Sequence, residues 1–169
     1  MSPFTTLFVV VLGAMLATRL WLATRQVRHV RAHRARVPAA FRTHIKPAAH
    51  RKAADYTVAR TRFGMVSLAV DALLLLGWTL GGGLELLDQA WRGAGFGELA
   101  TGAAFLLSAF VVMGLLELPL SLYQTFAIEA RFGFNRMTSA LWLADLAKGT
   151  ALAAALGLPF AALALWLMA

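Results

Sequence analysis

The sequence has no cysteine and few charged side chains. Without cysteine, a disulfide framework and a cysteine metal site are excluded, and the redox compartment cannot be inferred. Only 14% of the 169 residues are charged, compared with about 25% in an average soluble domain, while 60% are apolar. Together with a mean hydropathy of +0.69, this composition predicts an all-α integral membrane protein that forms one helical domain.

Acidic residues are nearly absent from one basic part of the chain. Twelve of the 16 lysines and arginines fall between Arg19 and Arg62, where Asp55 is the only acid. Because lysine and arginine concentrate in cytoplasmic loops, we expect loop 25–62 in the cytoplasm and the N-terminus outside. The expected location is a bacterial inner membrane.

The same basic segment has few aromatic residues. Arg28, Arg31 and Arg34 recur every three residues and would share one helical face, which favours contact with anionic lipid headgroups. Its aromatic residues are confined to Phe41 and Tyr56, so stacked bases have little to bind. We therefore expect the lipid bilayer as a partner and no nucleic acid.

Four long apolar runs dominate the rest of the sequence. At 1.5 Å per helical residue, each is long enough to cross a hydrocarbon core of about 30 Å. They predict four transmembrane helices, at about residues 3–24, 63–84, 99–128 and 139–168. The residues from Glu85 to Glu98 are expected to form a short outer turn, and loop 129–138 to lie in the cytoplasm.

Four charged residues lie within these apolar runs: Asp71, Glu117, Asp145 and Lys148. A charge that faces lipid costs at least about 2.5 to 3.5 kcal/mol, so we expect these groups to face each other or water. Two interpretations remain open, namely salt bridges and hydrogen bonds between helices, or a hydrated chamber open to the cytoplasm. Asp145 and Lys148, three residues apart, are placed to pair on one helical face.

The segment from Tyr123 to Thr138 joins the last two apolar runs and is unusually polar and aromatic. We name it the elbow. We expect Gly133 to permit a backbone turn that other residues cannot adopt. We expect the side-chain amide of Asn135 to contact a substrate backbone. The alternative is a capped interfacial turn in which Asn135 or Thr138 caps the following helix. The candidate residues are Glu129 and Arg131 as a clamp on the loop ends, Phe132 and Phe134 as anchors, and Gly133, Asn135 and Thr138.

The sequence holds no complete catalytic motif. His29 and His33 have the spacing of a zinc-binding helix, but Val30 stands where a zinc protease needs its glutamate, and neighbouring arginines would repel a dication. No His-Glu-x-x-His motif is present. We therefore expect no catalytic residue and no metal ligand in this segment.

Three stretches together resemble one family, the type-1 CAAX prenyl endopeptidases, which are multi-span zinc metalloproteases of membranes. The first is VPAAF at 37–41 with HRKAADYTVARTRFG at 50–64. The second is LPLSLYQTFAIEARFGFNRMT at 118–138, and the third is LWLADLAKGTALAAALGLPF at 141–160.

The resemblance implies the N-terminal part of a helical barrel around a hydrated chamber, ahead of a catalytic domain that holds zinc. The implied partners are that C-terminal catalytic domain and a protein or peptide substrate, either membrane-associated or prenylated. Because the catalytic motif is missing, we expect a fragment, or a truncated gene product, that is inactive alone. The alternatives are a non-enzymatic membrane scaffold or partner-binding protein, and a small transporter.

Overall fold

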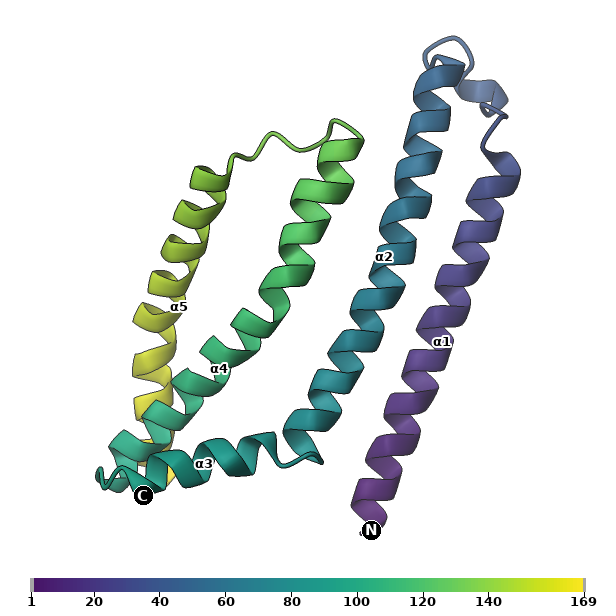
Figure 1. The fold of residues 1–169 in the computed structure, drawn as a ribbon. Helices are drawn as coiled ribbons and strands as arrows, with labels where there is room; N and C mark the ends of the chain where they lie inside the picture. Colours follow the sequence, from purple (N-terminus) through teal and green to yellow (C-terminus); the bar gives the residue numbers. More distant parts are fainter. Residues whose placement is uncertain (1, 169) are drawn as a thin grey trace. The chain divides into compact units, whose positions relative to one another are not determined.

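The computed structural model describes residues 2–168, apart from the side chains at 99, 162, 164–166 and 168. Within this part, every regular element is a helix. Figure 1 shows them in chain order. They are α1 (Pro3–His33), the 3₁₀ turn η1 (Ala39–Phe41), α2 (Pro47–Thr79), α3 (Gly83–Gly93), α4 (Glu98–Leu122), the π-helix η2 (Tyr123–Glu129) and α5 (Ser139–Met168).

Four helical segments are long and apolar enough to cross a membrane. They are Pro3–His33, Pro47–Thr79, Ala100–Glu129 and Ser139–Ala161. The prediction of an all-α membrane chain with four helices of this kind is confirmed. Most of their side chains are exposed in the chain by itself, and the buried hydrophobic residues are Leu12, Val27, Val37, Ala54, Ala72 and Ile128. Lipid or further protein must therefore cover the apolar surfaces.

Helix α1 continues well beyond its apolar run. Ser2 caps its start, because the Ser2 hydroxyl accepts the Thr5 amide proton at 3.2 Å. Its 31 residues span about 46 Å, more than a hydrocarbon core of about 30 Å. The loop predicted at 25–62 is therefore largely wrong: its start is helical to His33, since no proline or glycine interrupts it there, and its second half, from Pro47, belongs to α2.

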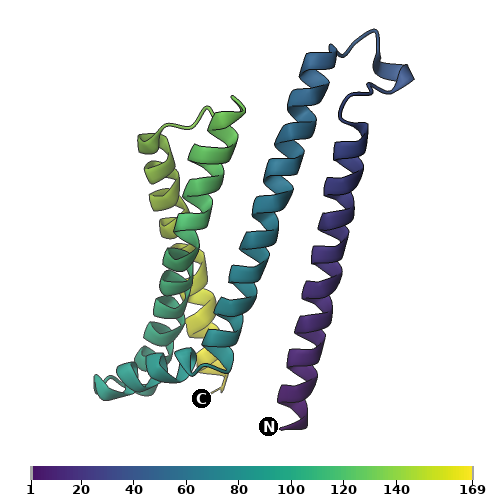
Figure 2. The same cartoon turned by 45° about the vertical axis from the view of Figure 1, so that its right-hand side comes forward.

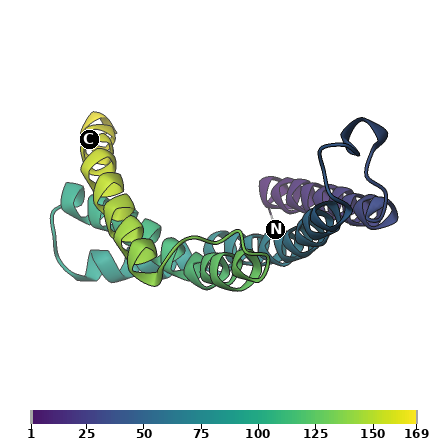
Figure 3. The ribbon, with the colours of Figure 1, turned by 90° about the horizontal axis from the view of Figure 1, so that it is seen from above.

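A short connection, residues 34–46, joins α1 to α2. Pro38 lies in the break, and Pro47 is the first residue of α2, where its missing amide proton costs nothing. Figure 2 shows α1 and α2 running antiparallel. In the view of Figure 3 the connection projects beyond the two helices.

Contacts divide the chain into two units. The first contains α1, α2 as far as Leu75, and Tyr123–Asn135. Its two long helices are joined by the Arg34–Asp55 ion pair, by a hydrogen bond between the His50 ring and the His33 carbonyl at 3.3 Å, and by Thr24 against the Met65 sulfur at 3.9 Å.

The second unit contains α3, α4 and α5. The outer turn predicted at Glu85–Glu98 is wrong, because most of it forms α3. Its polar residues follow the helical period, so that Asp88 accepts a hydrogen bond from Arg92 at 2.6 Å, one turn away. The Trp91 indole donates to Ser108 of α4 at 2.8 Å. The actual turn follows α3, where Gly95 has a φ of 75°.

Helices α4 and α5 run antiparallel and enclose an apolar hollow of about 510 Å³. Small residues, which let helix backbones approach closely, are frequent in its lining. They are Gly114, Ala153, Ala154, Gly157 and Ala161.

Candidate functional site

The elbow begins with a π-helix, Tyr123–Glu129, which continues directly from α4. Pro119, four residues before it, cannot donate to the carbonyl one turn earlier. The sequence predicted a polar turn here and not a π-helix, for which Pro119 is the nearby helix-disturbing residue. Because π-helices are rare and frequently lie at functional sites, this segment is the first candidate.

The elbow turns at Gly133. The Phe134 amide donates to the Glu129 carbonyl at 2.9 Å, and the Gly133 amide donates to the Ala130 carbonyl at 2.9 Å. This is the hydrogen-bond pattern of a Schellman motif, with the left-handed residue at Gly133, whose φ is 67°. A methyl group there would meet only the Lys52 ammonium nitrogen, at 3.5 Å. The requirement for glycine therefore comes from the backbone.

Tyr56 of α2 lies between the two phenylalanines of the elbow. Its ring centroid is 5.5 Å from that of Phe132 and 4.7 Å from that of Phe134. The Lys52 ammonium group lies 5.5 Å from the Phe134 ring centroid, within the range of a cation–π interaction. Phe63 and Tyr123 form a further contact at 5.1 Å. Aromatic packing thus joins the elbow to α2.

The side chains of Glu129 and Arg131 make separate contacts. Among the described residues no ion pair joins them. The Glu129 carboxylate instead accepts a long hydrogen bond from Gln124 at 3.5 Å, and the Arg131 guanidinium lies 5.8 Å from the Phe132 ring centroid. The backbone carbonyl of Glu129, and not its side chain, fixes the turn.

The last two candidate residues of the elbow differ in their roles. Asn135 is half-buried, and its backbone N–H group donates to the backbone carbonyl of Glu129 at 3.3 Å. The Thr138 hydroxyl accepts the Leu141 amide proton at 3.2 Å, which makes Thr138 the N-cap of α5. The capping alternative left open by the sequence therefore holds for Thr138.

The four charged residues within the apolar helices are all exposed in this chain: Asp71, Glu117, Asp145 and Lys148. Asp71 belongs to the first unit and the other three to the second. Among the described residues no ion pair joins Asp145 to Lys148, so the predicted pairing is wrong.

Asp55 pairs with Arg34 near the cytoplasmic end predicted for α2. The guanidinium donates to both carboxylate oxygens, at 2.5 and 2.6 Å. Hydrogen bonding to Asp55 raises the pKa of Arg34 above its usual value, and the negative charge of Asp55 raises it further. Arg131 attracts the same carboxylate electrostatically. Asp55 thus connects the end of α1 with the elbow.

No zinc site can be assembled from the residues that the structure describes. No group of three histidine or acidic side chains in that part of the chain could hold a metal ion. His29 and His33 stack, with ring centroids 4.3 Å apart, and the His33 Nδ1 atom is hydrogen-bonded to the His29 carbonyl at 2.9 Å. Zinc needs three or four ligands, so this donor set does not fit it.

The fold and the elbow define a class: a helical membrane domain whose exposed intramembrane charges require further protein or water. The chain belongs to the CAAX prenyl protease family, since the sequence-family model described as "CAAX prenyl protease N-terminal, five membrane helices" matches residues 26–169. The family resemblance predicted from the sequence is confirmed.

Similar proteins agree with this assignment. A mouse CAAX prenyl protease 1 homolog is 31% identical over 159 residues, covering 88% of this chain and 33% of the mouse protein. A Caenorhabditis elegans homolog is 30% identical, covering 90% of this chain and 34% of its own length. The chain thus spans about a third of these relatives. The crystal structure of S. mikatae Ste24p shares the fold, with a TM-score of 0.81 and 24% identity over 94% of this chain and 38% of that one.

Proposed function

We propose that the chain is the membrane-embedded N-terminal module of a zinc metalloendopeptidase resembling CAAX prenyl proteases. In this proposal it lines part of a hydrated chamber and shapes the access of membrane-associated or prenylated protein substrates. Cleavage itself belongs to a catalytic domain that holds the zinc ion and its ligands. The segment alone is therefore inactive.

The observation that carries the proposal is the exposure of the four intramembrane charges. Asp71, Glu117, Asp145 and Lys148 are exposed in the chain by itself, yet each would cost at least about 2.5 to 3.5 kcal/mol against lipid. Water or the rest of the protein must therefore cover them. A chamber wall fulfils this requirement, and family membership supports it.

The elbow is proposed to serve the catalytic domain from the cytoplasmic side. The basic segment before Arg62 supports this topology through the distribution of its positive charges. Within the elbow, Asn135 offers an amide that both donates and accepts hydrogen bonds, next to a turn fixed by Gly133. The relatives compared above come from eukaryotes, so a bacterial inner membrane remains a prediction.

Cysteine reactivity tests the chamber directly. The chain has no cysteine, and thiols react with polar maleimides only where water reaches them. In full-length protein without other cysteines, Asp71→Cys and Glu117→Cys should react with a membrane-impermeant maleimide from the cytoplasmic side.

The matched controls are Leu73→Cys and Leu115→Cys, each two residues away and about 200° around its helix. Their side chains are 68% and 57% exposed in the chain alone, so lipid is expected to shield them. Equal reactivity of both members of each pair, or none at Asp71 and Glu117, would contradict a one-sided chamber.

Sequencing the coding DNA beyond Ala169 complements this experiment, because an open frame without His-Glu-x-x-His would favour the non-enzymatic scaffold.

A further inference from the structure

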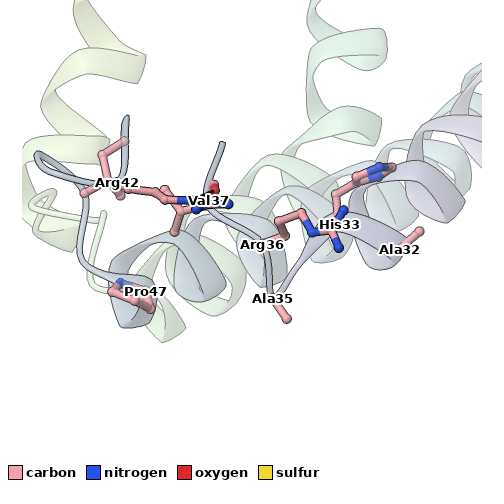
Figure 4. Close-up of a pocket in the computed structure, with 8 residues that line it drawn as sticks. Ala32, His33, Ala35, Arg36, Val37, Arg42 and Pro47 are labelled. Carbon is pink, nitrogen blue, oxygen red and sulfur yellow. Dashed lines mark hydrogen bonds between the residues drawn. The ribbon is translucent and has the colours of Figure 1, made fainter. Parts of the chain in front are cut away.

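A basic hollow of about 750 Å³ lies where α1 ends and α2 begins. Figure 4 shows seven of its lining residues labelled around the connection. The complete lining is Ala32, His33, Ala35, Arg36, Val37, Arg42, Ile45 and Pro47. It belongs entirely to the first unit, and the function proposed above does not use it.

The charges of Arg36 and Arg42 are not neutralised within the described residues. The ion pairs there are Arg34–Asp55 and Arg92–Asp88. Asp55 is the only acid between Arg19 and Arg62, and Arg34 occupies both of its oxygens. Two guanidinium groups therefore line one hollow without a carboxylate partner, which favours an external anion.

The local backbone strengthens this preference. The Arg42 Nε–H group donates to the carbonyl of buried Val37 at 3.3 Å, which holds the side chain while its two terminal nitrogens keep their protons available. The His33 carbonyl at the end of α1 already accepts from the Arg36 amide at 3.1 Å and is bonded to the His50 ring. Pro47 contributes the start of α2, whose positive dipole end offsets the negative dipole end of α1 at His33, so the positive charge of the hollow comes from the two arginines.

We propose that this hollow binds a phosphate group through Arg36 and Arg42. Guanidinium groups present a planar fork of donors that matches phosphate oxygens, often in pairs of parallel hydrogen bonds. Phosphate can come from a lipid headgroup or from a soluble phosphate compound, and both share this chemistry.

The height of the hollow above the membrane limits which phosphate compounds can reach it. His33 lies nine residues, or about 14 Å, beyond Thr24, where the first apolar run ends, whereas headgroups extend only about 5 to 8 Å beyond the hydrocarbon core. The hollow thus stands above the surface of a flat bilayer. Soluble phosphate reaches it freely, and among lipids only a headgroup with an extended phosphate would do so.

The test uses full-length protein in nanodiscs of zwitterionic phosphatidylcholine, with an environment-sensitive fluorophore on Thr43→Cys and no other cysteine. One arm titrates inorganic phosphate against sodium chloride at equal ionic strength. The second arm compares nanodiscs doped with phosphatidylserine or with a phosphorylated phosphatidylinositol. We expect a saturable fluorescence change in at least one arm, and the arm that responds identifies the source.

Three variants decide whether the two arginines are responsible. Arg36→Gln, which removes no side-chain hydrogen bond among the described residues, and Arg42→Gln should each weaken binding at least about tenfold, the effect of losing a charge-assisted hydrogen bond. Arg28→Gln removes an equal charge about 6 Å beyond Thr24, at headgroup level, and should leave binding unchanged. A response that never saturates, or an equal loss with Arg28→Gln, would overturn the proposal.

Discussion

The ring of Tyr56 lies 4.7 Å from the ring of Phe134, at an angle of 57° between their planes. This contact connects two stretches far apart in the sequence, the start of α2 and the elbow. Both stretches also carry the resemblance to the protease family. In the first unit, two sequence stretches that resemble the family therefore pack against each other and form one cluster.

We predict that Tyr56→Ala loosens the elbow. The substitution removes two ring contacts, each worth about 0.5 to 1.5 kcal/mol beyond area burial. Trypsin should then cut faster at Arg131 and Arg136 in the reconstituted protein, as measured by mass spectrometry. Tyr56→Phe keeps the ring and should cut at the original rate, whereas a similar acceleration in both variants would show that the hydroxyl, and not the ring stack, holds the elbow.

Gly133→Ala should destabilise the turn by about 1 to 2 kcal/mol, because φ is 67° there. The nearest atom to the added methyl group is 3.5 Å away, so a steric clash contributes little. Thermal unfolding in detergent measures the loss. Gly149→Ala in α5 is the control, since nothing lies within 4 Å of its added methyl group. It should stabilise by up to about 1 kcal/mol.

Thr138→Ala should destabilise the start of α5 by about 1 kcal/mol, because it removes the acceptor for the Leu141 amide. Amide hydrogen exchange in the first turn of α5 should accelerate. Thr138→Asp retains an acceptor and should preserve protection. Equal protection in all three proteins would mean that the cap does not limit opening of this helix.

In the full-length protease proposed above, Asn135→Ala should lower turnover of a prenylated peptide more than it lowers expression. The amide is proposed to contact substrate, so its loss should reduce kcat or raise KM without unfolding the protein. Thr138→Ala is the matched control, because its defect is expected in stability alone. A parallel fall in turnover and expression for Asn135→Ala would assign Asn135 a structural role.

The topology predicts the side from which single cysteines can be labelled. Ala40→Cys, in the connection between α1 and α2, should react with an impermeant reagent only from the cytoplasm. Ala94→Cys, just after α3, should react only from outside. The reverse pattern would overturn the assigned orientation and with it the cytoplasmic elbow.

Local sequence features predicted much of the fold. The apolar runs predicted four membrane-length helices. They did not predict the bounds of α1 and α2. The break between these helices contains Pro38 and ends at Pro47, because proline restricts its own backbone and that of the preceding residue. The expected turn at Glu85–Glu98 was wrong, because the polar and apolar residues of its first part alternate with the helical period of about 3.6 residues and form α3.

What the sequence determined by itself is the class: all-α, membrane-embedded and related to CAAX prenyl proteases, since hydropathy, charge bias and motif order are all properties of the linear chain. Only the tertiary structure decided that Tyr56 packs on Phe132 and Phe134 and that Arg34 takes the single acid of the basic segment. The pairings of Tyr56 and Arg34 join residues more than 20 positions apart. No local periodicity encodes them, because they depend on how the helices meet in space.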